Sequence, residues 1–248
     1  IALSRQAARE GMVLLKNNGG LLPLPSGSRV ALFGKGSFDY VKGGGGSGDV
    51  TVSYTRSVYD GLKLENVPVY EPLSDYYRNY VAERYAAGDV PGMMAEPELP
   101  ENLLDAARRE TDVAVIVISR FSGEGWDRSQ VGYVDEDYPW QDEVTLPKRA
   151  ERIFPKGDYY LTDAEQAMLE QVCTAFDKVA VVLNVGCVTD VSWFYADDRI
   201  ASVLLAYQGG MEGGVAVAEL LTGENTPCGK LPDTLARDLK DYPSTANF

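Results

Sequence analysis

The stretch "LTDAEQAMLEQVCTAFDKVAVVLNVG", residues 161–186, decides the fold class. Its first part, up to residue 178, has the apolar spacing of an amphipathic helix, and Thr162 and Glu165 are placed for a capping box. Its second part is a short continuous apolar run, which indicates a strand buried on both faces. A helix that leads directly into such a strand is typical of an α/β domain with a mostly parallel sheet.

The same alternation continues in both directions along the chain. Apolar runs predict strands at 29–34, 111–120, 179–186 and 200–208, and "VPVY" at 67–70 could be one more. Helices are predicted at 3–18 (with Ser4 as its cap), 57–64, 161–178, 190–197 and 210–223. Residues 72–110 are interpreted as surface helices around a Pro/Gly break at 88–100. Residues 129–158 have no clean period and are interpreted as a long polar loop or lid.

Composition limits the classes of function. The 248 residues carry a net charge of −14, which argues against a nucleic-acid partner and against an anionic membrane surface. No apolar run reaches the length of about twenty residues that a membrane-spanning helix needs. The chain has no histidine, which removes Ser-His-Asp and Cys-His catalysis and most zinc sites. Carboxylates are therefore the leading candidates for any chemistry.

The cysteines suggest neither a disulfide framework nor a metal site. Cys173, Cys187 and Cys228 are odd in number and widely spaced. We expect buried free thiols in a reducing compartment, which favours a cytoplasmic location and leaves secretion open. No metal is expected.

Ligands of parallel α/β sheets bind beside the loops that follow the carboxyl ends of the strands. Four loops of this chain qualify, and they begin after Phe33, Arg120, Val185 and Tyr207. We expect these loops to meet at one edge of the sheet.

The loop after Arg120 carries the strongest candidate in its "SGEGWDR" segment, residues 122–128. A carboxylic acid such as Glu124 can protonate a leaving oxygen if its pKa is raised, by partial burial against a ring such as Trp126 or by a second carboxylate. Asp127 and Arg128 could instead pair to hold the shape of the loop. The alternative interpretation of Glu124 is an exposed acid in a turn.

The glycine-rich loop "GGGGSG", residues 43–48, matches neither the phosphate-binding Walker pattern nor the dinucleotide fingerprint. A nucleotide cofactor is therefore not expected. Two interpretations remain: a flexible surface loop without a ligand, or a loop whose bare backbone approaches a polar ligand closely.

Several segments agree in order and wording with one known family. They are "VALFGKGSFDYVKGGGGSGDV", "VIVISRFSGEGWDR", "VVLNVGCVTDVSWF" and "LLAYQGGMEGGVAVAELLTGENTPCGKLPDT". Together they resemble the (α/β)6 sandwich domain of glycoside hydrolase family 3, the family of many β-glucosidases. The resemblance covers residues 1–248 apart from 71–100 and 129–155, which look like insertions.

The resemblance implies retaining hydrolysis of a β-glucoside or oligosaccharide by two carboxylates, without metal or cofactor. The nucleophilic aspartate of such enzymes lies on a TIM-like barrel domain, to which nothing in this chain is similar. The acid/base glutamate lies in the "SGEG" motif, which here contains Glu124. We expect a fibronectin-like domain and the barrel to follow this chain, an order that favours a bacterial source.

The same resemblance suggests roles for other residues. Gly46 and Ser47 would border the sugar subsites. Trp126 would stack on a sugar ring or only pack within its loop. Asp127 and Arg128 would brace the loop or touch substrate.

Some alternatives stay open at this point. Lys156 and Asp158, in "KGD", are interpreted as structural. The acids of the second insertion, most plausibly Glu136 or Glu143, could replace Glu124; these acids are Asp135, Glu136, Asp137, Asp142 and Glu143. The domain could also be a non-catalytic scaffold or sugar-binding module, or serve a β-xylosidase.

Overall fold

A computed structural model of the protein describes residues 1–124 and 146–246. Its strands form one sheet in the order β1-β5-β4-β3-β2. The strands are β1 Val13–Asn17, β2 Ala31–Phe33, β3 Val113–Arg120, β4 Lys178–Val185 and β5 Ile200–Leu205. All neighbouring pairs are parallel except β1 and β5. The prediction of a mostly parallel sheet is therefore confirmed.

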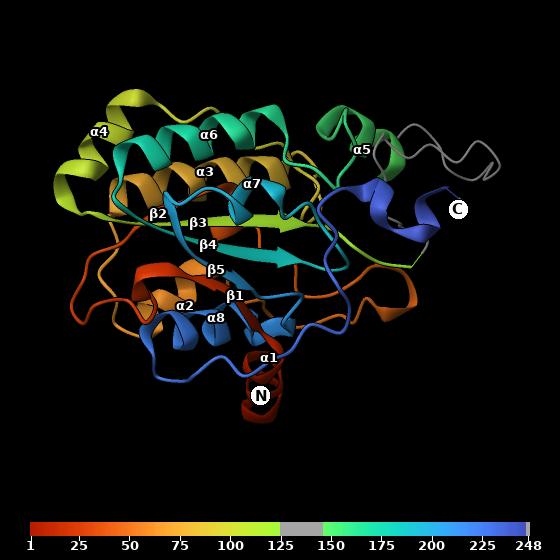
Figure 1. The fold of residues 1–248 in the computed structure, drawn as a ribbon, viewed down its shortest axis with the longest axis horizontal. Coiled ribbons are helices and arrows are strands. Elements are labelled where there is room, and N and C mark those ends of the chain that lie inside the picture. Colours follow the sequence, from red (N-terminus) through yellow and green to blue (C-terminus); the bar gives the residue numbers. More distant parts are fainter. Residues whose placement is uncertain (125–145, 247–248) are drawn as a thin grey trace.

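Helices cover both faces of this sheet (Figure 1). They are α1 Ala2–Gly11, α2 Val58–Leu64, α3 Glu71–Ala86, α4 Glu101–Glu110, α5 Leu146–Ile153, α6 Asp163–Ala175, α7 Ser192–Tyr195 and α8 Gly213–Thr222. Figure 1 shows α3, α4, α6 and α7 on one side and α1, α2 and α8 on the other. The sheet separates two hydrophobic cores, one on each face. Successive strand residues point to opposite faces, so Phe33 belongs to one core and Leu32 to the other. The result is an α/β sandwich.

One predicted helix is wrong in its second half. The helix expected at 3–18 ends at Gly11, and Val13–Asn17 forms β1, antiparallel to β5. The helix begins after Ile1, and Ser4 does not cap it. Glycine lowers helix propensity at residue 11, and the apolar run after it gains a hydrogen-bonded partner strand, which outweighs the local helical period.

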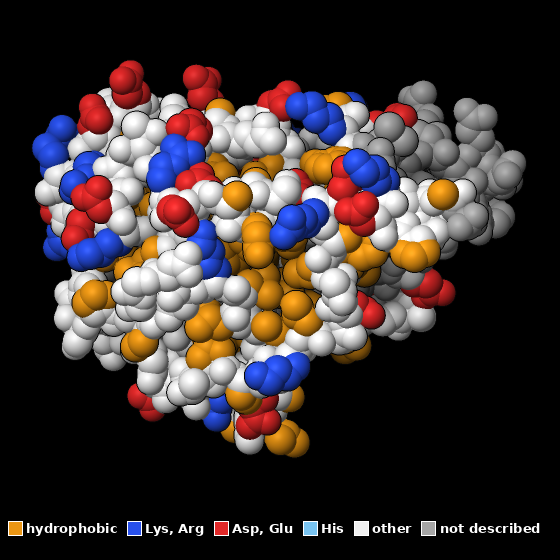
Figure 2. All heavy atoms as spheres, in the orientation of Figure 1, with side chains coloured by type: hydrophobic (Ala, Val, Ile, Leu, Met, Phe, Trp, Pro, Cys, Tyr) orange, Lys and Arg blue, Asp and Glu red, His pale blue; other side chains and the backbone are white. Residues whose placement is uncertain are grey.

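The edge of the sheet formed by β1 is not covered by a helix on the face drawn in Figure 2. There, hydrophobic side chains gather in a hollow between the two helical layers, where β1 and β5 lie in Figure 1. β1 is the outermost strand on this side, and its residues after Val13 are only partly buried.

Helices α3 and α4 agree with the interpretation of residues 72–110 as surface helices, and α3 also contributes to the core. Leu73, Tyr77 and Val81 are buried and recur every four residues, which places one stripe of α3 in the core beside β2. Charged and tyrosine residues around this stripe hide it in the sequence. The Pro/Gly break at 88–100 does separate α3 from α4. Whether 71–100 is an insertion in the family stays a prediction.

The short "VPVY" run contributes a sixth position to the sheet rather than a full strand. Val69 forms a single parallel bridge with Val30, just before β2. The Val30 amide donates to the Pro68 carbonyl at 2.8 Å, and the Tyr70 amide donates to the Val30 carbonyl at 2.9 Å. The run therefore extends the sheet beyond β2 by one residue.

The cysteines only partly match the expectation. All three are free, but Cys173 is buried whereas Cys187 and Cys228 are exposed. The prediction of buried thiols is therefore wrong for two of the three. Within the two described ranges, no helix combines the length and apolar character needed to cross a bilayer.

Candidate functional site

The loops after β2 and β3 are joined through their backbones. Gly45 and Gly123 form a parallel bridge, and the Gly45 amide donates to the Ser122 carbonyl at 3.0 Å. A Cβ atom on Gly123 would lie 2.3 Å from the Gly45 nitrogen, so this approach requires glycine. The close backbone approach predicted for the glycine-rich loop is therefore made to the neighbouring loop. Approach to a ligand stays a prediction.

The loops after β4 and β5 adjoin the same place. The Ser122 hydroxyl lies 3.3 Å from the Cys187 thiol, in the loop after β4. The Gly210 amide, in the loop after β5, donates to the Lys42 carbonyl at 2.7 Å. The four loops thus meet at the carboxyl edge of the parallel strands, as predicted.

Three of the predicted site residues come together there. One carboxylate oxygen of Glu124, Oε2, accepts hydrogen bonds from the Ser47 backbone amide at 2.8 Å and from the Ser47 hydroxyl at 2.7 Å. Gly46 has a φ of +73°, and a Cβ atom there would lie 2.5 Å from the Glu124 Cβ. The turn at Gly46 therefore brings both donors of Ser47 onto the carboxylate.

The electrostatics of Glu124 differ from the expectation. The carboxylate is exposed, and the hydrogen bonds from the Ser47 hydroxyl and then from the Ser47 amide lower its pKa. The raised pKa that the acid role requires is therefore not seen among the described residues, and burial against Trp126, which lies outside them, stays a prediction. As it stands, Glu124 is an ionised hydrogen-bond acceptor.

The remaining predicted residues of this loop lie outside the described residues. They are Trp126, Asp127 and Arg128, together with the alternative acids Asp135, Glu136, Asp137, Asp142 and Glu143. Their roles stay predictions.

The "KGD" segment makes contacts that agree with a structural role. Lys156 pairs with Asp163 at 2.5 Å on the surface. The backbone carbonyl of Asp158 accepts a hydrogen bond from the Arg120 Nε at 3.2 Å. The first contact reaches the first residue of α6, and the second joins the segment before α6 to the end of β3.

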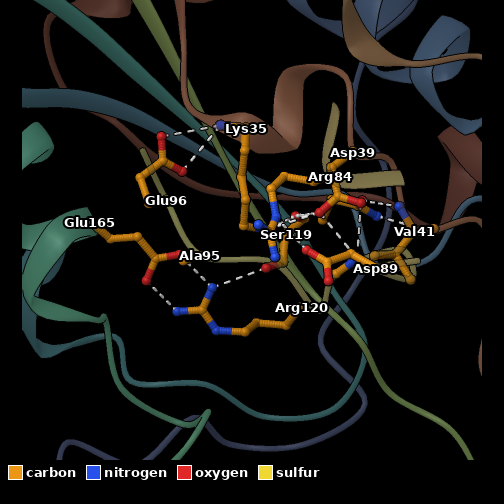
Figure 3. Close-up of polar contacts among 12 residues, drawn as sticks. Lys35, Asp39, Val41, Arg84, Asp89, Ala95, Glu96, Ser119, Arg120 and Glu165 are labelled. Carbon is orange, nitrogen blue, oxygen red and sulfur yellow. Dashed lines mark hydrogen bonds and ion pairs between the residues drawn. The ribbon is translucent and has the colours of Figure 1, made fainter. Parts of the chain in front are cut away.

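Sequence reasoning missed a buried polar cluster beneath this edge of the sheet, formed by Lys35, Asp39 and Ser119 (Figure 3). Lys35 and Asp39 are 1% and 0% exposed. The Lys35 ammonium lies 3.0 Å from Asp39 Oδ2 and 2.8 Å from the Ser119 hydroxyl, which itself lies 3.1 Å from Asp39 Oδ2. The only sequence signal is the four-residue spacing of Lys35 and Asp39, which a solvated loop would show equally.

A second buried pair lies beside the first (Figure 3). The Arg120 guanidinium donates to both carboxylate oxygens of Glu165 at 2.6 Å. Burial by itself would raise the pKa of Glu165, but the Arg120 charge and hydrogen bonds outweigh it and lower that pKa. The pair connects the end of β3 to the first turn of α6.

Glu96 is the third buried acid of this region. Both of its oxygens accept from the Lys35 backbone amide, at 3.2 and 3.1 Å. Burial raises the pKa of Glu96 to about 8, against the opposing charge of Lys35. Burial therefore favours the protonated form of Glu96 at neutral pH.

Among the described residues, no three His, Cys, Asp or Glu side chains are placed to share a metal ion. What the fold and the site define is an α/β sandwich that presents a hydrogen-bonded carboxylate at the carboxyl edge of its sheet. A carboxylate in this place is chemically able to accept a proton.

Comparison with known proteins identifies the family. The glycosyl hydrolase family 3 C-terminal domain matches residues 12–248. The chain is 53% identical, over its whole length, to β-glucosidase A of Butyrivibrio fibrisolvens, and 37% identical over 96% of its length to a β-glucosidase of Ruminococcus albus. A crystal structure of a β-glucosidase from Paenibacillus barengoltzii superposes on the whole chain with a TM-score of 0.83 at 37% identity, the chain covering 25% of that protein.

This chain therefore belongs to glycosyl hydrolase family 3 and corresponds to the domain that the family calls C-terminal. It spans 30% of the Butyrivibrio protein and 23% of the Ruminococcus protein. Both source organisms fit the bacterial source expected from the sequence.

Proposed function

We propose that this chain is the acid/base domain of a retaining β-glucosidase that hydrolyses terminal non-reducing β-D-glucosyl residues, with Glu124 as the acid/base. The observation that carries the proposal is the Glu124 carboxylate, hydrogen-bonded by Ser47 where the four loops meet. The β-glucosidases that the chain resembles support the substrate class. The nucleophilic aspartate would come from a barrel domain of the longer protein.

The proposed reaction has two steps. In the first, the aspartate attacks the anomeric carbon, and Glu124 gives its proton to the glycosidic oxygen as the bond to the leaving group breaks. In the second, Glu124 takes a proton from water, whose oxygen attacks the anomeric carbon and frees the aspartate. The anomeric configuration is inverted twice and so retained.

The two steps need two protonation states of Glu124. The exposed carboxylate with a lowered pKa is the form that acts as base in the second step. Covering the loop with a sugar or with the barrel domain would desolvate the carboxylate and raise its pKa, which prepares the acid form. Ser47 would border the subsite in which the sugar that covers Glu124 binds.

The second candidate is a scaffold or sugar-binding module without catalysis. It is favoured by the exposure and the lowered pKa of Glu124, which do not suit a proton donor. A single experiment distinguishes the two candidates.

The experiment replaces Glu124 by alanine in the full-length enzyme and compares aryl β-glucosides with poor and good leaving groups. We expect kcat/KM to fall by about 10²–10⁴ on the poor leaving group and less on the activated one, because only the poor one needs protonation. Azide should restore turnover and give the β-glucosyl azide, since it needs no base. The control is Glu101→Ala, which removes an exposed carboxylate from the start of α4 and should leave both rates unchanged.

Retained activity on both substrates would contradict the proposal. Glu136 and Glu143 would then be replaced in turn. If all three variants remain active, the domain acts as a scaffold or sugar-binding module.

A further inference from the structure

The buried carboxylate of Asp39 joins four separate segments of the domain. It accepts from the Lys35 ammonium at 3.0 Å, which lies in the turn after β2, and from the Ser119 hydroxyl at 3.1 Å, near the end of β3. It also accepts from the Tyr85 hydroxyl at 2.8 Å, near the end of α3, and from the Gly92 amide at 3.0 and 3.1 Å, in the loop before α4. A buried charge that is satisfied from four directions fixes those segments relative to one another.

The donors and acceptors of this cluster are mutually consistent. The Lys35 ammonium donates to both Asp39 and Ser119, and the Ser119 hydroxyl, which accepts from Lys35, donates its own proton to Asp39. Asp39 is acceptor only in this arrangement, so it holds its place as the ionised partner of Lys35. The cluster is a closed triangle of charge-assisted hydrogen bonds.

Two direct contacts connect the buried cluster to the loops that hold Ser47 and Glu124. A Cβ atom on Gly92 would lie 2.4 Å from the Phe121 nitrogen, so the segment bound by Asp39 lies directly on the backbone of Phe121. A Cβ atom on Gly45 would lie 2.5 Å from the ring of Phe121, so that ring lies against the glycine-rich loop. Phe121 therefore separates the cluster from the Gly45–Gly123 bridge.

The chain itself gives a second connection. Ser119 stands five residues before Glu124 on the same segment, and Asp39 stands eight residues before Ser47. Both partners of the Ser47–Glu124 hydrogen bonds are thus attached, through a few residues each, to one buried triangle.

We propose that Asp39, with Lys35 and Ser119, is a positioning cluster that holds the Glu124 carboxylate against Ser47 and so sets the place from which its proton is delivered. The inference rests on the proposed role of Glu124. None of the three residues touches substrate in this proposal, because all three are buried beneath the loops.

A positioning role has a signature that loss of folded protein lacks. A misplaced acid slows cleavage of glucosides whose leaving group needs a proton, whereas an activated leaving group departs without one. The ratio of kcat/KM for an activated aryl β-glucoside to that for a poor one should therefore rise. Loss of folded enzyme lowers both values equally and leaves the ratio unchanged.

The test uses Ser119→Ala and Gly92→Ala in the full-length enzyme, together with Glu124→Ala as reference. Asp39→Asn is the most direct change, but it leaves the buried Lys35 ammonium without its countercharge and can prevent folding. Ser119→Ala keeps the Lys35–Asp39 pair and removes only its link to β3. Gly92→Ala places a methyl group against the Phe121 backbone.

Gly223→Ala is the matched control for Gly92→Ala. Gly223 also has a positive φ, +80° against +75°, and its Cβ atom would also meet a close neighbour, Pro23 at 2.6 Å. Gly223 directly follows α8. The Leu221 carbonyl in the last turn of α8 accepts from the Leu24 amide, which precedes β2, so Gly223 lies at the amino edge of the parallel strands. The backbone strain from the positive φ is similar, although the neighbour met is a proline side chain rather than backbone, and it acts at the opposite edge of the sheet from Glu124.

We expect the ratio to rise about tenfold in Gly92→Ala and severalfold in Ser119→Ala, and to keep its wild-type value in Gly223→Ala. Active enzyme is counted by trapping the glycosyl intermediate with an activated 2-fluoro-β-glucoside. An unchanged ratio in both cluster variants, or an equal rise in the control, overturns the inference. If Glu124→Ala itself leaves the ratio unchanged, the proposed function fails first, so the two failures are distinguishable.

Discussion

At the scale of single residues, the site depends on a turn that only glycine makes easily. Gly46 combines a φ of +73° with a backbone so close to Glu124 that an added Cβ would lie 2.5 Å from the Glu124 Cβ and 2.7 Å from Oε2. Gly48, two residues on, has nothing within 4 Å of an added Cβ. The two glycines therefore have different functions within one loop.

This difference predicts opposite results for one substitution. Gly46→Ala should push the carboxylate out of place and lower kcat/KM of the full-length enzyme about 10²-fold, since displacement of a catalytic group by about 1 Å costs this much. Gly48→Ala should keep wild-type activity. Steady-state rates on a phenyl β-glucoside measure both. Equal activity of the two variants would show that the Ser47–Glu124 contact has no catalytic role.

The hydroxyl of Ser47 sets the ionisation of Glu124. Because its hydrogen bond is the largest cause of the lowered pKa, Ser47→Ala should raise the pKa of Glu124, while the Ser47 amide still donates. The chemical shift of the Glu124 carboxyl carbon, followed by NMR as a function of pH, reports this directly. Ser47→Thr keeps a hydroxyl and should titrate like the wild type. A downward shift in the alanine variant would contradict the assignment.

At the scale of elements, the start of α6 is fixed by a capping box that also serves the site. The Thr162 hydroxyl accepts from the Glu165 amide at 3.2 Å, and Glu165 accepts from the Thr162 amide at 2.8 Å. The same Glu165 binds Arg120 at the end of β3. The box predicted from the sequence is therefore confirmed, and it orders the helix and the strand together.

Loss of this cap has a measurable cost in stability. Thr162→Ala should lower the free energy of unfolding by about 1 kcal/mol, because the Glu165 amide loses its acceptor at a helix start. Thr174→Ala, on an exposed position near the end of the same helix, should change it by only a few tenths of a kcal/mol. Urea unfolding compares the two. A similar loss in both variants would mean that the box adds nothing beyond helix propensity.

The elements also show how far sequence reasoning reaches. The strands β3 and β4 were predictable because their apolar runs are short and rich in valine and isoleucine, which favours a strand buried on both faces over a helix. β1 was not, because its strand form depends on pairing with β5, nearly two hundred residues away in the chain. Likewise, the position of the Glu124 loop could be predicted because it follows a predicted strand. The contact of Glu124 with Ser47 could not, because it joins residues 77 positions apart in the chain.

The buried cluster was beyond prediction for the same reason. Lys35 and Asp39 have the spacing of an ordinary surface pair. Their burial depends on contacts with distant residues, since Ser119 binds Lys35 and the Gly92 amide binds Asp39. Charged residues are rarely buried without partners, and those partners come from distant segments.

At the scale of the whole molecule, the candidate site residues gather at one edge of the α/β sandwich. All four strand-end loops and the buried cluster lie at the carboxyl edge of the parallel sheet, while the helices that cover both faces supply the two cores (Figure 1). Glu124 lies at this edge, and its proposed partner, the nucleophilic aspartate, would come from a barrel domain; we therefore propose that the barrel domain contacts this edge.

The buried acid Glu96 gives the whole domain a dependence on pH. The pKa of Glu96 lies at about 8 in the folded chain and returns to its ordinary value of 4.5 once the chain unfolds. Between these values the folded state binds a proton that the unfolded state releases, so Glu96 contributes stability at low pH that is lost as pH rises toward 8. The charges that act on it are Lys35, Glu165 and Arg120, of which only Glu165 reinforces burial.

Replacement of this acid by its neutral isostere should remove that loss. Glu96→Gln keeps an oxygen that accepts from the Lys35 amide and cannot ionise. From pH 5 to pH 8 the stability of the variant relative to the wild type should therefore rise by roughly 3 kcal/mol. Urea unfolding at both pH values measures this, with Glu101→Gln, an exposed acid, as the control that shifts stability equally at both. If wild type and Glu96→Gln change in parallel from pH 5 to pH 8, Glu96 is ionised throughout, and the Lys35 charge and amide outweigh its burial.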